Sequence, residues 1–142
     1  MLSKTAKYGI KAVIFIAHQS LQQKRVGVPE IALGIEAPQH FIGKIVQQLA
    51  KFGVLSSIKG PNGGFEMSEK QRKATNIRTI VEILDGPDLY TKCGLGLENC
   101  SAGKPCPIHD AYAEVRHKII SMHTNASVDE MANDINDISF LK

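Results

Sequence analysis

The sequence predicts a mainly α-helical protein with a small β-hairpin wing, arranged as a winged helix-turn-helix head followed by a long C-terminal helix. Three observations support this prediction. Apolar residues recur at helical spacing in three successive segments of the first half. A glycine-rich turn with β-branched and aromatic flanks follows the third segment. The second half contains a further long amphipathic segment.

The first half predicts three helices. The first is expected from Ser3 to about Gln22, where an apolar stripe lies opposite three lysines. The second begins at Pro29, a residue that suits the first turn of a helix, and stops before Pro38. The third begins near Pro38 and ends at Phe52, with Gly53 as the cap. Its polar face offers amide, imidazole and ammonium groups, namely Gln39, His40, Lys44, Gln47 and Lys51. Two short helices joined tightly in this way have the organisation of a helix-turn-helix.

The segment from Val54 to Ser68 is predicted to form a strand, a turn and a second strand. The turn, Gly60 to Gly64, supplies left-handed conformers and one fixed proline angle, and Val, Ile and Phe flank it. A hairpin directly after a recognition-type helix is the wing of a winged helix. The alternative is an ordinary surface hairpin.

The second half predicts three more helices around a cysteine loop. Thr75 or Asn76 can cap a fourth helix that ends at Gly86 and Pro87, after which the cysteine loop follows at once. Pro107 is expected to open a fifth helix whose apolar stripe reaches toward His123 and needs a packing partner. A sixth, short helix is expected after Ser127, because Ser127 and Glu130 have the spacing of a capping box.

Charge divides the chain into two regions. Residues 1–70 hold 9 Lys and Arg against 4 Asp and Glu, a balance of +5, and residues 71–142 hold 8 against 10, a balance of −2, which together give the overall +3. We therefore expect residues 1–70 to bind a polyanion as a winged helix-turn-helix region, and residues 71–142 to carry the cysteine loop and the long helix. A solvated lysine-rich surface is the alternative reading of the basic half.

Composition narrows the function classes. At 142 residues with 43% hydrophobic content, the chain can form an ordinary globular core. No phosphate-binding loop, dinucleotide fingerprint or nucleophile elbow occurs, so we predict that the protein is not an enzyme. The longest apolar run, Ala12 to Ala17, is too short to cross a bilayer, and the start of the chain lacks the pattern of an export signal. We expect no membrane partner and a reducing cytoplasmic location.

The three cysteines, Cys93, Cys100 and Cys106, lie within fourteen residues, and His109 follows three positions later. An odd number of thiols cannot form a complete set of disulfides, and the glycine-rich spacers let a short loop fold back on itself. The pattern indicates a metal or iron–sulfur site. A structural zinc site, or thiols that react directly with oxidants, are the alternatives. His109 could also be an unliganded surface histidine, with His117 and His123 as less well placed substitutes.

Several of these segments together resemble one family of regulators. They are Ser3 to Ala17, Ile31 with Ala32, Leu49 to Leu55, the wing sequence Lys59 to Phe65, Ile80 to Pro87, and the cysteine loop. Over nearly its whole length the chain resembles the winged-helix (BadM-type) transcriptional regulators typified by the iron–sulfur cluster regulator IscR and the nitric-oxide-sensing repressor NsrR. The resemblance implies a homodimer on a palindromic double-stranded DNA operator, with a long C-terminal dimerisation helix. It also implies a cluster loop that sets DNA affinity or sequence preference.

The resemblance also implies a ligand set. Cys93, Cys100 and Cys106 with His109 would hold a 2Fe–2S cluster, which we favour over 4Fe–4S, with zinc as the alternative. Six residues separate Cys93 from Cys100 where the family commonly has five. An acidic residue near the N-terminus of the partner subunit can complete a 4Fe–4S site in the nitric-oxide-sensing branch. This chain has Tyr8 in that region and no carboxylate before Glu30, which disfavours that version.

Candidate DNA contacts separate by chemistry. Lysines can grip phosphates without reading sequence, and the candidates are Lys4, Lys7, Lys11, Lys44 and Lys51. Gln39 and His40, at the start of the third helix, can present donors and acceptors to base edges, and Gly43 would permit close approach. Ser57 and Lys59 at the wing base are placed near phosphate or the minor groove mainly by the resemblance. Simple solvent exposure is the alternative for each polar residue.

The sequence thus predicts a dimeric DNA-binding transcriptional regulator controlled by a cluster in the Cys93 to Cys106 loop, responding to redox state, nitric oxide or iron–sulfur status. A zinc or thiol-redox regulator of the same fold, or a metal-stabilised protein-interaction module, is the alternative.

Overall fold

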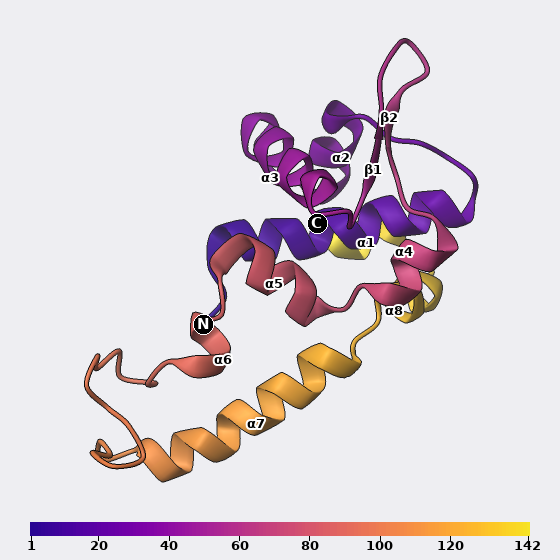
Figure 1. Cartoon of the computed structure of the whole chain (residues 1–142). Coiled ribbons are helices and arrows are strands. Elements are labelled where there is room, and N and C mark those ends of the chain that lie inside the picture. The colour runs from indigo at the N-terminus through magenta and orange to yellow at the C-terminus, as the bar shows by residue number, and fades with distance from the viewer.

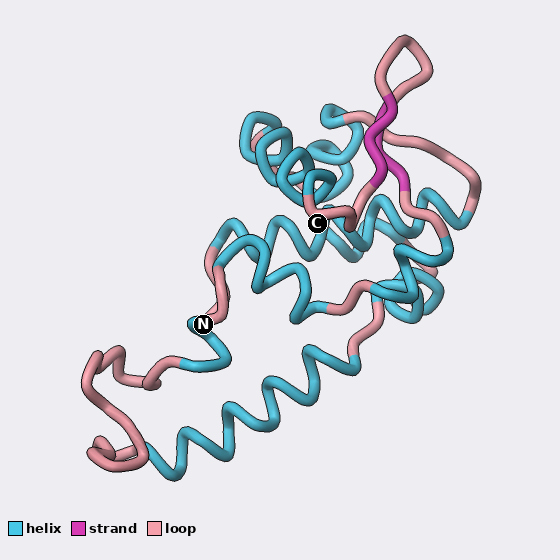
Figure 2. Tube along the Cα trace, viewed as in Figure 1, coloured by secondary structure: helices cyan, strands magenta, loops and turns pink.

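A computed structural model describes all 142 residues. The chain is mainly helical with one two-stranded antiparallel sheet, as predicted (Figures 1 and 2). None of its helices combines the length and the apolar character that crossing a bilayer would require. The elements in order are α1 (Lys4–Leu21), α2 (Val28–Ile35), α3 (Gln39–Lys51), β1 (Ser56–Ile58), β2 (Gly64–Glu66), α4 (Glu69–Ala74), α5 (Ile77–Asp85), α6 (Asp88–Thr91), α7 (His109–Asn125), α8 (Val128–Asp134) and the 3₁₀ helix η1 (Ile138–Leu141).

Helix α1 lies at the centre of the molecule and packs against α2, α3, α5 and α8. Every residue from Ala12 to Ala17 is buried, so this part of the helix is surrounded by other elements. The Ser3 side chain caps the helix by accepting from the Ala6 backbone N–H at 3.0 Å, and the Ser3 hydroxyl also bonds the Asp85 carboxylate at the end of α5. The first helix is therefore fixed at its start to the helix that leads to the cysteine loop.

Helices α2 and α3 form the predicted helix-turn-helix. The turn between them is tight because Glu36 adopts a left-handed conformation (φ 52°) and the Ala37 N–H bonds back to the Ala32 carbonyl at 2.9 Å. The apolar stripe of α3 is buried against α1 and α2, and consists of Ile42, Ile45, Val46 and Leu49. Its polar face is left exposed.

The predicted hairpin forms, with strands shorter than the segment suggested. Ser57 pairs with Phe65, whose side chain is buried in the core. Val26, just before α2, exchanges two backbone hydrogen bonds with Phe65 and ties the hairpin to the helical head. Gly63 is required by space, since a Cβ there would lie 2.1 Å from the Ile58 carbonyl oxygen. The wing thus projects from the head and is tied to it at its base (Figure 1).

The second half differs from the prediction at three places. Helix α4 was not predicted because none of its residues is buried, although its Ser68 and Gln71 form a capping box that the sequence displays. Helix α6 stands between Pro87 and the cysteine loop, so the loop does not follow α5 at once. Helix α7 begins at His109 and not at Pro107, because Cys106 to His109 forms a turn closed by the His109 N–H to Cys106 carbonyl bond.

The last two helices return to the head. The predicted helix after Ser127 forms, but the Ser127 side chain makes no capping hydrogen bond, so the predicted capping box is wrong. Instead, backbone hydrogen bonds join the start of α8 to the start of α5, from Ile77 N–H to Ala126 carbonyl and from Val128 N–H to Thr75 carbonyl. A half-buried ion pair between Arg72 and Asp129, at 2.9 Å, adds to this junction.

Helix α7 runs along the side of the molecule opposite the wing (Figure 1). Only His123, near its end, is buried. The His123 Nδ1 atom lies 2.8 Å from the hydroxyl of buried Tyr90 in α6, and Arg78 of α5 lies over the Tyr90 ring. Burial lowers the pKa of His123 below its usual 6.5 and raises the pKa of Tyr90 to about 12. Neutral His123 therefore anchors the end of α7 to α6.

This anchor predicts a loss of stability in mild acid. A histidine whose pKa is lowered by folding binds its proton more readily when unfolded, so its contribution is complete above about pH 6.5 and is lost as the pH falls below that value. We expect the urea midpoint of the wild type to fall more between pH 7.5 and pH 5.5 than that of His123→Asn, whose amide oxygen can accept from Tyr90 without titrating. Equal falls in the two proteins would contradict the role given to His123.

Candidate metal centre and nucleic-acid interface

The loop between α6 and α7 is folded by its own short-range hydrogen bonds. Cys93 begins a turn in which the Gly96 N–H bonds to the Cys93 carbonyl at 2.9 Å, with Gly96 at φ +74°. Ser101 and Lys104 then exchange two backbone hydrogen bonds, each 3.1 Å long. This small turn brings Cys100 and Cys106 opposite each other.

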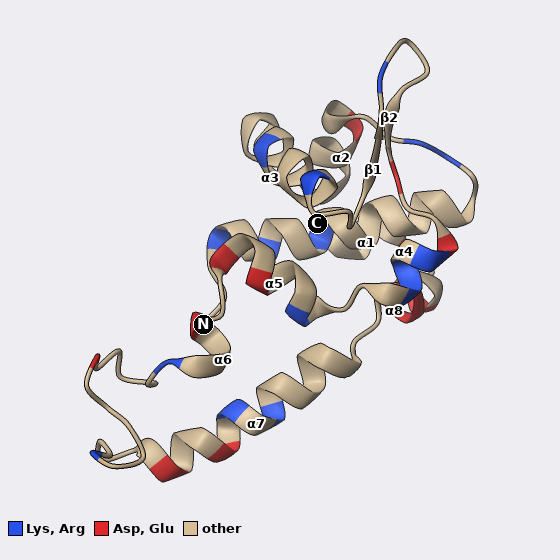
Figure 3. Cartoon of the chain, in the orientation of Figure 1, with Lys and Arg blue, Asp and Glu red and all other residues tan.

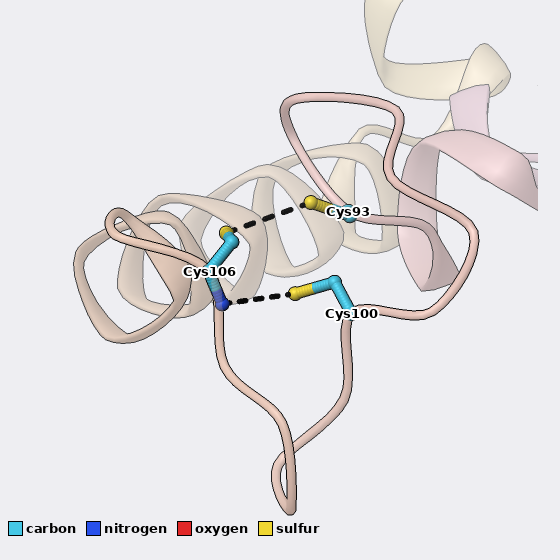
Figure 4. A group of neighbouring side chains, drawn as sticks. All are labelled: Cys93, Cys100 and Cys106. Carbon is cyan, nitrogen blue, oxygen red and sulfur yellow. Dashed lines mark hydrogen bonds between the residues drawn. The ribbon is translucent and has the colours of Figure 1, made fainter.

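The three cysteine sulfur atoms converge, all within 4.8 Å of one another (Figure 4). The Cys93 and Cys106 sulfurs lie 3.6 Å apart, and the Cys106 backbone N–H points at the Cys100 sulfur at 3.4 Å. His109, in the first turn of α7, places Nδ1 at 3.3 Å from the Cys100 sulfur. The structure thus gathers the three cysteine sulfurs and places His109 beside one of them, Cys100; the assignment of all four as metal ligands stays a prediction.

The electrostatics differ between the thiols. Backbone N–H groups of Leu97 and Leu95 point at Cys93 and lower its pKa to about 7. The Cys106 N–H acts in the same direction on Cys100, but partial burial and the neighbouring thiols outweigh it and raise the pKa of Cys100. A thiolate is therefore easier to form at Cys93, and a cation at the centre would be needed to hold all three sulfurs as thiolates.

Helix α7 supports the loop through residues that the sequence did not reveal. The Tyr112 ring lies against Gly94, where a Cβ would come within 2.7 Å of it. Arg116 stacks on Tyr112 and donates from Nη2 to the Lys92 carbonyl at 2.9 Å. Both neighbours of Cys93 are thus held to α7. The spacing of Tyr112 and Arg116, one helical turn apart, is the only sequence signal for this contact.

The donor set fits a thiophilic metal. Two thiolates bound to one tetrahedral metal at about 2.3 Å lie about 3.8 Å apart, close to the separation of the Cys93 and Cys106 sulfurs. Three thiolates with one imidazole suit zinc or an iron–sulfur centre. The two substitute histidines lie elsewhere: His123 is occupied by Tyr90, and His117 is exposed on α7.

A second candidate site lies on the head, where α1 and α3 meet. Lys4 Nζ lies 5.8 Å from the centroid of the Tyr8 ring, Tyr8 neighbours Phe41 at 6.3 Å, and Phe41 neighbours His40 at 4.8 Å between centroids. These contacts connect the start of α1 to the start of α3. The sequence did not single out the aromatic part of this surface, because its members lie far apart along the chain.

The remaining candidate DNA contacts lie on the same half of the chain. Basic positions occur on α1, α3 and the wing, whereas α5 and α7 carry both signs and α8 is acidic (Figure 3). All are exposed except Lys11, which is half-buried; the exposed ones are Lys4, Lys7, Gln39, His40, Lys44, Lys51, Ser57 and Lys59. A Cβ at Gly43 would meet only Val28 at 3.8 Å, so internal packing does not require glycine there.

Comparison with known proteins identifies similar regulators. The Rrf2 family model, described as an iron-dependent transcriptional regulator, matches residues 2–134. A protein of Aquifex aeolicus assigned to the helix-turn-helix (HTH) type of transcriptional regulators is 32% identical over 136 residues, which cover 94% of this chain and 92% of that protein. The HTH-type transcriptional regulator IscR of Vibrio cholerae is 25% identical over 140 residues, covering 97% of this chain and 79% of IscR.

Solved structures share the fold. CymR (YrzC), the global cysteine regulator of B. subtilis, superposes with a TM-score of 0.78 at 20% identity, covering 96% of this chain and 98% of CymR. IscR of T. potens superposes with a TM-score of 0.70 at 18% identity, covering 94% of this chain and 87% of that structure. These likenesses support the winged-helix architecture described above.

Proposed function

Since the chain belongs to the Rrf2 family of transcriptional regulators, we propose that it is a homodimeric DNA-binding protein whose operator affinity is controlled by an iron–sulfur cluster. Members of this family are transcriptional regulators and not enzymes. The convergence of three cysteine sulfurs within 4.8 Å, beside His109, is the observation that carries the cluster proposal. We expect the protein to act in the cytoplasm, where thiols stay reduced.

The iron dependence described for the family favours a 2Fe–2S cluster over zinc. The three sulfurs lie within 4.8 Å of one another, and Cys100 contacts His109, so the loop would have to open slightly for the four side chains to reach two irons. A 2Fe–2S cluster takes two protein ligands on each iron. When bound, the cluster would supply redox and nitric-oxide chemistry. A zinc ion in the same four donors is the second candidate, supported by the same Cys93 to Cys106 separation.

The loop offers a route from metal to DNA. It joins α6, whose Tyr90 packs against α1 and α5, to the first turn of α7. Ordering a flexible loop costs about 1–2 kcal/mol per residue in backbone entropy, and ligation offsets that cost. Loss of the metal would weaken the link between α6 and the first turn of α7, which the Arg116 and Tyr112 contacts alone would then maintain. If α7 pairs the two subunits, the spacing of the two heads changes with it.

We propose that residues 1–70 bind DNA and that residues 71–142 hold the metal and pair the subunits. The start of α3 would enter the major groove, with Gln39 and His40 at base edges and the lysines of α1 and α3 on phosphates. Ser57 and Lys59 would approach phosphate or the adjacent minor groove. Because two heads related by a twofold axis read half-sites about 34 Å apart, the operator would be palindromic.

Replacing polar side chains of α3 should have two different effects on DNA binding. Lys44→Ala should weaken binding to all duplexes alike and reduce the slope of log affinity against log salt by about 1. His40→Ala should cost about 1–3 kcal/mol on the preferred duplex and relax its sequence preference. Fluorescence anisotropy at several KCl concentrations measures both, with Lys118→Ala on α7 as the matched lysine control. An unchanged salt slope in Lys44→Ala would show that Lys44 does not contact the DNA backbone.

The direct test compares protein with and without its metal. Protein purified without oxygen would be characterised by its absorption and electron-spin spectra and by metal analysis, and then used to select a duplex from a random pool. We expect iron, visible absorbance, and an affinity for the selected duplex that changes at least about tenfold, or about 1.4 kcal/mol, when a chelator strips the iron. A colourless protein with one zinc per chain would show that the site binds zinc and not an iron–sulfur cluster. Identical affinity with and without metal would show that the metal does not regulate DNA binding.

A further inference from the structure

Two of the three thiols are close enough to react with each other. The Cys93 and Cys106 sulfurs lie 3.6 Å apart, and a disulfide requires about 2.05 Å. We propose that Cys93 and Cys106 are a redox-active pair that a hydroperoxide closes into an intramolecular disulfide when no metal is bound, leaving Cys100 as a free thiol and blocking metal uptake until the bond is reduced. The effect on metal uptake rests on the proposed ligand set, whereas the thiol pair itself does not.

Helix α7 prearranges this pair without any metal. Lys92 and Gly94, on either side of Cys93, are held to α7 by the Arg116 hydrogen bond and by the face of the Tyr112 ring. Cys106 lies on the chain that enters the same helix and is linked to its first turn by the His109 N–H to Cys106 carbonyl bond. Both sulfurs are therefore positioned by one rigid element. All three cysteines are partly exposed, so a small oxidant can reach them.

Cys100 lies within 4.8 Å of both other sulfurs but is engaged by two polar groups of its own. Its sulfur accepts the Cys106 backbone N–H at 3.4 Å and lies 3.3 Å from His109 Nδ1. Pairing Cys100 with either of the other cysteines would turn its sulfur away from these two contacts. Closing Cys93 onto Cys106 moves the two sulfurs about 1.5 Å closer and leaves the turn closed by Ser101 and Lys104 intact. The sulfur–sulfur distance of 3.6 Å and the His109 contact of Cys100 therefore favour the Cys93–Cys106 pairing over the other two.

The reaction balances with a hydroperoxide as the oxidant. One thiolate of the pair attacks the peroxide O–O bond, which breaks, forming a sulfenic acid and releasing an alcohol, or water from hydrogen peroxide. The second thiolate attacks the sulfenic sulfur, forming the S–S bond and releasing water after proton transfer. Two thiols lose two electrons and two protons, and the peroxide is reduced by two electrons. An external dithiol reverses the change by thiol–disulfide exchange.

Peptide mapping tests the pairing. Metal-free, reduced protein is treated with hydrogen peroxide, its remaining thiols are alkylated, and the digest is analysed by mass spectrometry without reduction. We expect reactive thiols to fall from three to one per chain, a Cys93–Cys106 linked peptide, and alkylation at Cys100 alone. Cys100→Ser should form the same link, whereas Cys93→Ser and Cys106→Ser should not. A link that involves Cys100, links only between chains, or three surviving thiols would overturn the proposal.

Cobalt binding tests the consequence. Reduced, metal-free protein titrated with Co²⁺ should develop thiolate-to-cobalt absorbance, and the oxidised protein should lose nearly all of it until a phosphine reductant restores it. Unchanged cobalt uptake after oxidation would refute the block. If the reduced protein itself binds no cobalt, the proposed metal site is refuted. The peptide map alone then tests whether Cys93 and Cys106 form the redox-active pair. Circular dichroism of each variant confirms that the helices are intact, so that a missing link cannot come from unfolding.

Discussion

Cys93→Ala, Cys100→Ala and Cys106→Ala are each expected to be colourless when purified without oxygen, whereas the unaltered protein is coloured. The three sulfurs surround one centre, so each variant removes a ligand that no nearby side chain can replace. Iron should fall from about two atoms per chain to almost none. His123 and His117 cannot substitute, because the first is bonded to Tyr90 and the second lies about two turns of α7 beyond His109.

The measurement is visible absorbance with iron analysis on protein handled without oxygen. Asn99→Ala is the matched control, since Asn99 is an exposed neighbour of Cys100 on the same loop. His109→Ala should behave differently from the cysteine variants, with a shifted spectrum or a less durable cluster, because water can occupy a single open position. Full colour in any one cysteine variant would remove that cysteine from the ligand set.

Val115→Glu is expected to give a monomer that binds the operator at least about a hundredfold more weakly. Exposed apolar side chains follow one side of α7 at intervals of seven residues, and they are Ile108, Val115 and Met122. Val115 and Met122 are 50% and 60% exposed, and this apolar row is where we propose that a second copy packs. A charge buried there would prevent pairing. Two linked heads bind DNA about 10²–10⁴ times better than one.

Sedimentation gives the oligomeric state, and anisotropy on the selected duplex gives the affinity. Thr124→Glu is the control: it adds the same charge to the same helix, about half a turn round from Val115. We expect it to remain dimeric with unchanged affinity. A dimeric Val115→Glu protein would show that α7 does not pair the subunits through this row.

The parts of the fold that the sequence predicted are those with large apolar residues at regular spacing. Helix α3 shows this, since Ile42, Ile45, Val46 and Leu49 form its buried stripe. Helices α4 and α6 were missed because they are too short for a periodic pattern. Helix α4 has no buried residue, and α6 has one, Tyr90. Helix α7 was predicted to begin too early because Pro107 suits a first helical turn but here lies in the turn before it.

The residues of the candidate metal site could be predicted from their type. The residues that hold its loop in place could not, because they are recognised only by their tertiary contacts. Cysteines have few roles and their clustering is visible directly, so the sequence named the three cysteines that the loop brings together and the histidine beside Cys100. Tyr112 and Arg116 are ordinary residues for a helix surface. Only the folded chain shows that they hold the segment on either side of Cys93. The aromatic contacts joining α1 to α3 were hidden for the same reason.

The backbone junction between the starts of α5 and α8 has a consequence for the integrity of the chain. Helix α7 is continuous with a segment whose Val128, Ala132 and Leu141 are buried in the main core, and His123 holds its end to α6. A protease that cuts the exposed stretch from 94 to 99 would therefore leave two fragments that stay associated under native conditions and separate only in denaturant. Nicked protein should elute from a sizing column with the intact form.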